Sequence, residues 1–208
     1  MSFKNLPHYS DCVCQLKDIL DYDTDFIVEG MKRYHVINSG IEPNQSNINA
    51  WKDEINSLKA IVASLRRTNK TYLDLHIVFE YKMPKYQYDE SFIFADVIIV
   101  SNNKIALVEF KQRDHTIGKM FAAEVAKYRN RLRKHHLKSK DKQIKAFMVL
   151  TKEDDECFYE PICTKFNGIK CKYIQVSPPV FPYELFEWFK DSEPIDDITE
   201  WVKSYWLF

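Results

Sequence analysis

Apolar residues recur along the chain at two spacings, one typical of helices and one typical of strands. The apolar residues between positions 47 and 66 share one helical face: Trp51, Ile55, Leu58, Ile61, Val62 and Leu65. Ser46 or Asn47 can cap the start of this helix. From Leu73 to Phe79 every second residue is instead apolar, which predicts a strand that ends at Pro84.

Three more strands and a second long helix follow. The segments 92–100 and 104–112 are rich in β-branched and aromatic residues, and Asn102-Asn103 between them suits a tight turn. A helix is expected at about 119–136 and a fourth strand at 143–151. The order helix, three strands, helix, strand predicts an α/β domain whose mixed central sheet is flanked by helices.

The segments on either side of this core predict helical extensions. Residues 1–45 include DCVCQLKDILDY, which has nearly helical apolar spacing, and residues 153–208 include the short helical stretches PYELFEWFK and ITEWVKSYW. We therefore divide the chain into a helical N-terminal extension (1–45), a core (46–152) and an aromatic-rich C-terminal extension packed on the core (153–208). Trp188, Trp201, Trp206 and Phe208 in the last segment could instead form a homodimer or partner surface.

The composition excludes several classes of protein. The 208 residues include only four glycines, and neither GxGxxG nor GxxxxGK[ST] occurs, so a Rossmann or P-loop nucleotide site is not expected. No apolar run reaches signal or transmembrane length, so no membrane contact is expected. Five cysteines, an odd number, favour a reducing compartment and a cytoplasmic location.

The cysteines also raise the question of an iron–sulfur cluster. Some nucleases hold such a cluster with one cysteine before the core and three after it, and Cys12 with Cys157, Cys163 and Cys171 superficially fits. The loose spacings and the remote position of Cys12 disfavour the cluster, and buried free thiols are the alternative.

Two carboxylates and an ammonium are predicted to meet at one end of the 92–112 hairpin. If Asn102-Asn103 forms a two-residue turn, Asp96 lies directly opposite Glu109, where like charges repel. Lys111 shares a strand face with Glu109 because side chains alternate. A hard divalent cation such as Mg²⁺ or Mn²⁺ would relieve this repulsion, and the backbone carbonyl of Phe110 could supply a further oxygen. The alternative is a surface ion cluster, which the apolar residues preceding Glu109 disfavour.

A third carboxylate has two candidates. Glu54 lies near the apolar face of the 47–66 helix and could reach the sheet, whereas Glu80 stands at the end of the first strand. The sequence does not decide between them.

Positive charge gathers on the second long helix and just after it. Residues 127–145 contain nine lysines and arginines and one acid, although the whole chain is neutral with 30 basic and 30 acidic residues. Glu124 and Tyr128 lie one turn apart, and the expected nucleic-acid contacts of this helix are Glu124, Lys127, Tyr128, Arg131, Arg133 and Lys134, with His136 extending the positive surface. A solvated charged helix is the alternative.

Asp96, Glu109 and Lys111, in the pattern D-x12-E-x-K on adjacent strands, resemble the PD-(D/E)XK nuclease superfamily. Glu124 to Tyr128 resembles its QxxxY motif, with Glu in place of Gln, and Ala95 replaces the proline. The segments SNINAWKDEI, EYKMP, ADVIIV and VEFK, within 46–152, are similar to nuclease-like domains at the N-terminus of some bacterial helicase-type ATPases.

This resemblance implies a restriction-endonuclease-like core and metal-dependent hydrolysis of phosphodiester bonds. Asp96 and Glu109 would hold Mg²⁺ or Mn²⁺, Lys111 would act on the water or the transition state, and the substrate would be nucleic acid, DNA before RNA. The alternative function is a nuclease-fold module that binds nucleic acid or another protein without cutting.

Overall fold

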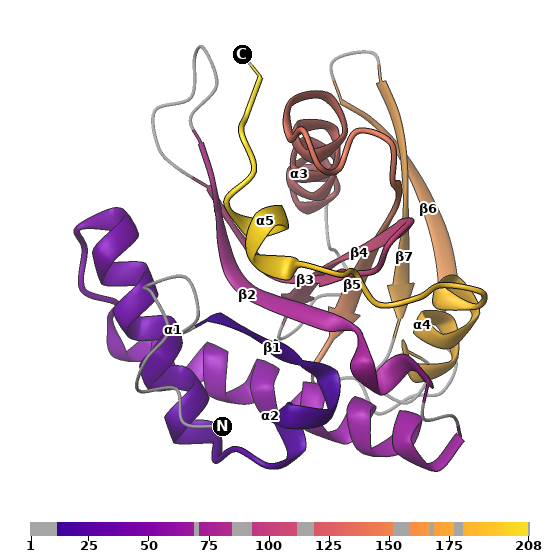
Figure 1. Ribbon diagram of the computed structural model, residues 1–208. Helices are drawn as coiled ribbons and strands as arrows, with labels where there is room; N and C mark the ends of the chain where they lie inside the picture. Colours follow the sequence, from indigo (N-terminus) through magenta and orange to yellow (C-terminus); the bar gives the residue numbers. More distant parts are fainter. Residues whose placement is uncertain are drawn as a thin grey trace.

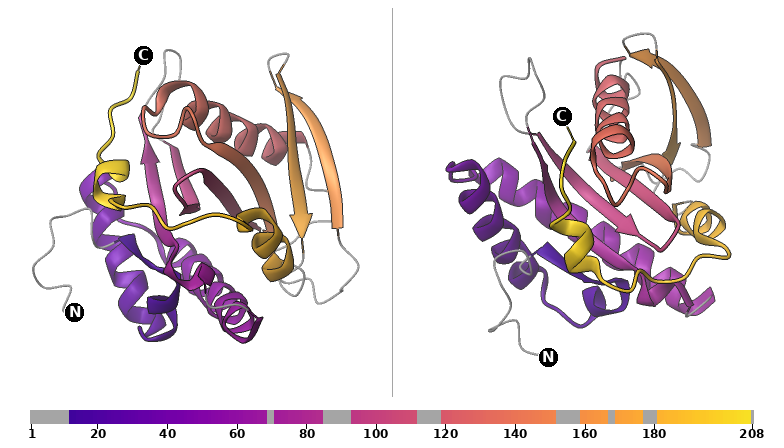
Figure 2. Two further views of the ribbon diagram at one scale, coloured as in Figure 1. Left: turned by 45° about the vertical axis from the view of Figure 1, so that its right-hand side comes forward. Right: turned by 45° about the horizontal axis from the view of Figure 1, so that its top comes forward.

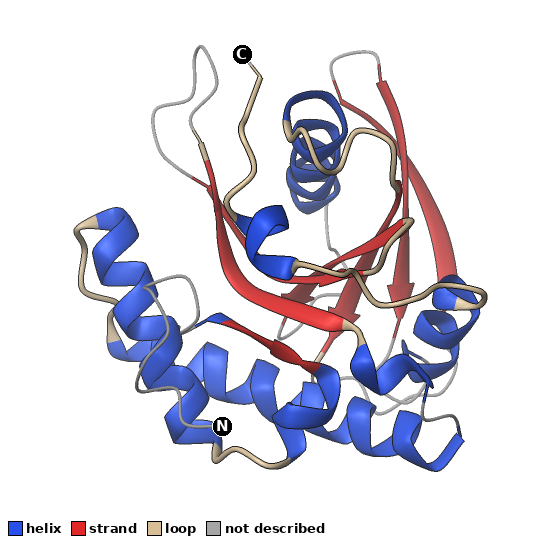
Figure 3. Cartoon of the chain, in the orientation of Figure 1, coloured by secondary structure: helices blue, strands red, loops and turns tan. Residues whose placement is uncertain are grey.

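A mixed β-sheet with helices on both faces forms the centre of the molecule (Figure 1). The computed structural model describes residues 12–68, 71–84, 93–111, 119–151, 159–166, 169–176 and 181–207. Figure 3 shows the sheet lying between the helices of its two faces. The α/β class with a mixed central sheet is therefore confirmed. None of the helices in these ranges combines the length and apolar character that crossing a bilayer requires.

Within the described residues the strands form one seven-stranded sheet in the order β1-β2-β3-β4-β5-β7-β6. Their bounds are β1 Val13–Gln15, β2 His76–Met83, β3 Ile93–Val100, β4 Lys104–Lys111, β5 Gln143–Leu150, β6 Tyr159–Phe166 and β7 Ile169–Val176. The pairs β4–β5 and β5–β7 are parallel and the remaining pairs are antiparallel. The predicted order of helix, three strands, helix and strand is confirmed for α2 (Gln45–Thr68) to β5.

The two faces of the sheet carry different helices (Figure 2). The elements are η3 Leu16–Leu20, α1 Thr24–Ser39, α2 Gln45–Thr68, η4 Thr71–Asp74, α3 Lys119–His135, α4 Phe181–Phe189 and α5 Ile198–Val202. The apolar stripe of α2 packs on one face with α1 and α4, and α3 packs on the other face with α5. The six residues predicted to line the inner face of α2 are all buried.

Both flanking segments contain strands that apolar spacing did not predict. Val13–Gln15 pairs with β2 as an edge strand, followed by a 3-10 helix, where a helical lead-in was expected. Residues 159–176 form the hairpin of β6 and β7. Pairing with a neighbouring strand satisfies the backbone of these short segments, and this tertiary effect outweighs their local preferences.

The tight turn of the β3–β4 hairpin has the register that the sequence predicted. The Ser101 amide donates to the Lys104 carbonyl (2.9 Å), and the paired residues run from Val100–Ile105 to Val97–Val108. The chain near the C-terminus anchors this turn: the Asn102 amide donates to the Glu193 carbonyl (2.9 Å). The hairpin that carries Asp96 and Glu109 is thus fixed at its closed end.

The regular alternation of side chains breaks once in each of two adjacent strands. In β2, Phe79 lies in the core beneath α2 whereas Tyr81 lies in the core beneath α3. In β3, Val97 and Ala95 are divided between the two cores in the same way. Phe79 pairs with Val97 and Tyr81 pairs with Ala95, so the break falls at the two facing positions between them, 80 and 96.

The C-terminal aromatic residues pack largely against the domain. Trp201 is fully buried with Tyr81 and His136, and its indole donates to Ser139 Oγ (3.1 Å). Trp188 donates to the Ile105 carbonyl (3.1 Å). Trp206 also contacts Tyr81 and His136. Phe208, which was proposed for a partner surface, lies outside the described residues.

Candidate functional site

The open end of the β3–β4 hairpin brings Asp96 and Glu109 together. Beyond the last ladder pair, Val97–Val108, side chains replace the ladder bonds. The Phe110 amide donates to Asp96 Oδ2 (2.9 Å), and the Asp96 amide donates to Glu109 Oε1 (3.4 Å). The two carboxylates therefore occupy the gap where the strands diverge, which agrees with the predicted opposition of these residues.

Lys111 completes this group. Its Nζ lies 3.6 Å from Glu109 Oε2, and the side chain is 22% exposed while that of Glu109 is 2% exposed. The ammonium thus neutralises a buried carboxylate and keeps one side toward solvent. A half-buried cation beside a carboxylate that is 2% exposed is unlike a solvated surface ion cluster, in which the acids would be exposed.

Glu54 adds a third carboxylate from α2. Its Oε2 is buried and has no hydrogen-bond partner among the described residues. Burial, followed by the charges of Asp96 and Glu80, holds the pKa of Glu54 well above its ordinary value, and Lys111 opposes the shift. A buried carboxyl oxygen without a hydrogen-bond partner costs free energy of folding. Glu54 at this position therefore serves something other than stability.

The environment of Asp96 also disfavours its ionised form. Burial raises its pKa from 3.8 to about 6 against the opposing charge of Lys111, and Glu80 raises it further. The hydrogen bond from the Phe110 amide favours the ionised form. Shifted carboxyl groups gathered in one place are typical of functional sites.

The other candidate third acid, Glu80, is engaged elsewhere. Its Oε1 accepts a hydrogen bond from the Trp51 indole (2.9 Å), and its Oε2 lies 3.5 Å from His35 Nδ1. Glu80 has a positive φ of 47°, a conformation that glycine favours and glutamate rarely adopts. Of the two alternatives left open by the sequence, Glu54 therefore has the available oxygen. His35 was not among the predicted site residues, since no local sequence pattern connects it with Glu80.

The donor set agrees in kind with a hard divalent cation, because Asp96, Glu109 and Glu54 offer carboxylate oxygens. The unpartnered Glu54 Oε2 supports this match. Within the described residues, however, no group of three or more His, Cys, Asp or Glu side chains is gathered closely enough to hold a metal ion. To bind one ion, these carboxylates would have to lie closer together than they do in this structure.

Within the described part of the chain, the cysteines form no metal-ligand group comparable to these carboxylates. The Cys12 thiol is buried and donates to the Gly30 carbonyl (3.9 Å). Burial and the charge of Asp18 raise the pKa of Cys14. Cys157 and the side chains of Cys163 and Cys171 lie outside the described residues.

The residues of α3 expected to contact nucleic acid divide into buried and exposed groups. Tyr128 is 3% exposed, and Arg131 is 4% exposed, with its Nη1 donating to the Pro84 carbonyl (2.8 Å). His136 is fully buried, and burial lowers its pKa to about 4, so it does not extend the positive surface at neutral pH. Tyr128, Arg131 and His136 are thus packing residues, and their use as surface contacts is corrected.

The exposed part of the basic surface is smaller. Arg133 and Lys134 are exposed, and Lys127 is partly exposed. The side chain of Glu124 lies outside the described part, so its predicted role is not addressed by the structure.

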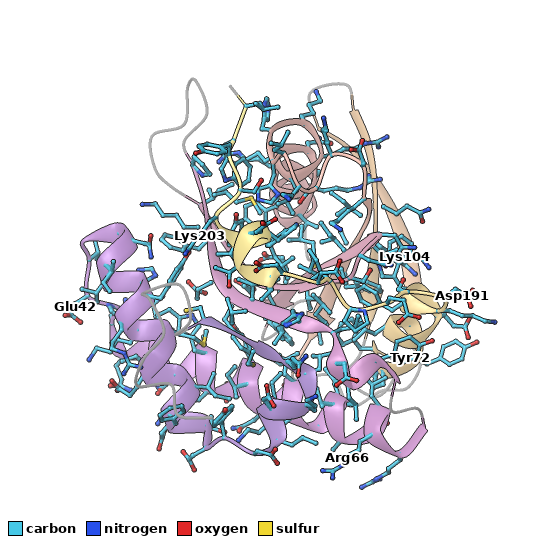
Figure 4. The ribbon with its side chains drawn as sticks, in the orientation of Figure 1. Glu42, Arg66, Tyr72, Lys104, Asp191 and Lys203 are labelled. Atoms are coloured by element: carbon cyan, nitrogen blue, oxygen red, sulfur yellow. The ribbon has the colours of Figure 1, made fainter. Side chains whose placement is uncertain are left out.

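A cleft opens between α1, the end of β2 and the chain after α5. Figure 1 shows α1 and α5 on either side of β2. The polar and aromatic residues of its walls are Tyr34, Asn38, Lys82, Lys203, Ser204 and Trp206. Lys203, labelled in Figure 4, lies beside α5 and is exposed. Tyr81 and Lys82, which follow Glu80 in β2, line this cleft, whereas the acidic residues described above are not among its lining residues.

The sequence matches no known protein family and no curated protein. Among solved structures, protein VC1899 from Vibrio cholerae is similar with a TM-score of 0.40 and 15% identical residues. The similarity covers 86% of this chain and 46% of that protein, so the chain spans less than half of its length. This degree of similarity gives no basis for assigning a function, which must be argued from the site itself.

Proposed function

We propose that the protein is a nuclease that hydrolyses phosphodiester bonds with the help of Mg²⁺ or Mn²⁺. The observation that carries this proposal is the group formed by Asp96, Glu109 and Lys111 at the open end of the β3–β4 hairpin, beside the unpartnered oxygen of Glu54. Asp96, Glu109 and Glu54 would hold the cation. When bound, the cation supplies positive charge that offsets negative charge developing on a phosphate.

The raised pKa values support a cation at this place. Burial and the neighbouring acids raise the pKa of Asp96 to about 6 and hold the pKa of Glu54 well above its ordinary value, so the ionised carboxylates are costly at this place. A divalent cation would offset this cost and relieve the repulsion, because it binds the deprotonated forms. The energetic cost of grouping the carboxylates is therefore recovered on binding.

Lys111 has the role of a fixed positive charge beside the reacting phosphate. Its Nζ is held near Glu109 and remains partly open to solvent, so a phosphate oxygen can approach it. An ammonium aimed at the developing charge stabilises the transition state without reorganisation.

The cleft between α1, β2 and the chain after α5 suits a chain of nucleotides. Lys82 and Lys203 can face phosphates, and Tyr34 and Trp206 can contact sugars or bases. Arg133 and Lys134 of α3 provide a second basic surface. A single strand is the expected occupant, because its unstacked bases can contact the aromatic side chains, and the 2′-hydroxyl would distinguish RNA from DNA there.

The test compares two lysine variants of the same strand. Purified wild-type protein is incubated with single- and double-stranded DNA and RNA, with Mn²⁺, with Mg²⁺ and with EDTA. Lys111→Met is expected to lower the cleavage rate at least 100-fold. Lys104→Met, at the other end of β4, where Nζ donates to the Lys190 carbonyl, is expected to keep the wild-type rate.

Two results would reject the proposal. One is the absence of cation-dependent cleavage by the wild-type protein, and the other is equal cleavage by Lys111→Met and Lys104→Met. Binding of nucleic acid without any cutting would instead favour the non-catalytic module considered above.

A further inference from the structure

His35 and Glu80 form a pair beside the carboxylate group that the function proposed above does not use. His35 Nδ1 lies 3.5 Å from Glu80 Oε2, and the Trp51 indole fixes the other carboxylate oxygen at 2.9 Å. The imidazole ring packs against Phe94 with ring centroids 4.8 Å apart, and against Trp51 at 5.6 Å. These contacts fix the orientation of both members of the pair.

The backbone at Glu80 is held in an unfavourable conformation. A non-glycine residue with φ of 47° is in an energetically unfavourable conformation, which persists only where surrounding contacts impose it. Interruptions of the regular strand conformation redirect side chains and occur near functional sites. Here the interruption turns Glu80 toward Trp51 of α2 and His35 of α1.

The pair adjoins the proposed cation ligands on three elements. Glu80 occupies the position facing Asp96 where β2 and β3 break their alternation. In β3, Phe94 beneath the imidazole is two residues from Asp96. In α2, Trp51 is nearly one turn from Glu54. The charge of Glu80 acts on both Asp96 and Glu54.

The imidazole keeps one edge accessible. Its Nδ1 is buried and makes no hydrogen bond among the described residues, so its relation to Glu80 is an ion-pair distance, while the side chain as a whole is 20% exposed. A carboxylate next to Nδ1 favours the tautomer with the proton on that nitrogen, which leaves the lone pair on Nε2.

We propose that His35 is the proton acceptor of this site and that Glu80 is the residue that positions it. The proposal rests on the nuclease function. In the reaction, the water oxygen forms a bond to phosphorus while the bond to the leaving oxygen breaks. The water proton passes to His35 Nε2, and the leaving oxygen takes a proton from solvent. Lys111 then needs only to supply charge, as its contact with Glu109 suggests.

The first measurement uses the unaltered chain and needs no enzymatic activity. Nitrogen-15 chemical shifts of the imidazole, recorded above pH 8, distinguish the two neutral tautomers. We expect the Nδ1-protonated tautomer for His35 in the wild-type protein, and a shift toward the Nε2-protonated tautomer in Glu80→Gln. A wild-type His35 protonated on Nε2 would overturn the proposal, because that nitrogen could not accept a proton.

The second measurement is the single-turnover cleavage rate with Mn²⁺. His35→Gln is expected to lower the rate 100- to 10,000-fold, while nucleic-acid affinity changes less than threefold. Added imidazole should restore part of the rate of His35→Ala. The control is His76→Gln, since His76 lies at the start of the same strand as Glu80 but away from the break.

The outcomes separate the two proposals. An active wild-type protein with an equally active, folded His35→Gln variant overturns the role of His35 and leaves the nuclease function standing. If His35→Gln fails to fold, two other results test the role of His35: the tautomer in the wild-type protein and the rescue of His35→Ala by imidazole. Absence of the Nδ1-protonated tautomer or of the rescue overturns the role. An inactive wild-type protein overturns both.

Discussion

Replacing Asp96 with asparagine removes a half-buried negative charge and keeps an oxygen that can accept the Phe110 amide hydrogen bond. Burial raises the pKa of Asp96 from 3.8 to about 6, so the folded state binds its proton more tightly than the unfolded state does. Between these values, stability must therefore fall as pH rises. We expect Asp96→Asn to abolish this loss and to stabilise the protein above pH 6.

The size of the effect follows from the shift. A rise from 3.8 to about 6 corresponds to on the order of 3 kcal/mol when Asp96 is ionised in both states. Because the residue is partly exposed, solvent reduces this figure, and we expect a gain of roughly 1–3 kcal/mol at pH 8. Near pH 4 the difference between the two proteins should be below about 1 kcal/mol.

Urea unfolding followed by tryptophan fluorescence and circular dichroism at pH 4, 6 and 8 measures this difference. Asp25→Asn is the matched control, because Asp25 is 72% exposed and pairs with Lys52 on the surface (2.7 Å). Its stability should change by less than about 1 kcal/mol at each pH. Equal or lower stability of Asp96→Asn at pH 8 would refute the electrostatic reasoning.

Further predictions concern four other positions. Glu54→Gln should bind Mn²⁺ at least tenfold more weakly in calorimetry and release fewer protons, since burial and neighbouring acids raise the pKa of Glu54. His136→Gln should flatten the rise of stability between pH 4 and 6.5: burial lowers the pKa of His136 from 6.5 to about 4, so the unfolded chain binds more protons there. Unchanged pH dependence would contradict this. Lys82→Glu combined with Lys203→Glu should weaken single-strand binding at least tenfold in fluorescence anisotropy, with reduced salt dependence; unaltered affinity would remove the cleft from the binding surface.

The positions of the carboxylates in the β3–β4 hairpin could be predicted from sequence, because a short turn determines which residues of the two strands face each other. Two asparagines between apolar strands fix the register, and the register places Asp96 opposite Glu109. The core helices and strands were likewise found from spacing alone, to within a few residues. Helices and strands with one buried face can be predicted in this way, because their apolar side chains recur at regular spacings.

The break at Glu80 could not be predicted, because the rule of alternation assumes an uninterrupted strand. The pairing of His35 with Glu80 joins residues far apart in the chain, and no local pattern reports it. The burial of Tyr128, in contrast, had a sequence signal. Val125, Tyr128 and Leu132 lie on one helical face, and all three are buried. The predicted surface role of Tyr128 rested on the charges of neighbouring residues and did not take this apolar stripe into account.

The coupled break in β2 and β3 constrains how related chains could have diverged. Each strand shifts its alternation at one of two facing positions, 80 and 96. Deleting a single residue from only one strand would turn half of that strand inside out while its neighbour stayed unchanged. Insertions and deletions in these strands should therefore occur in matched pairs across evolution, or not at all.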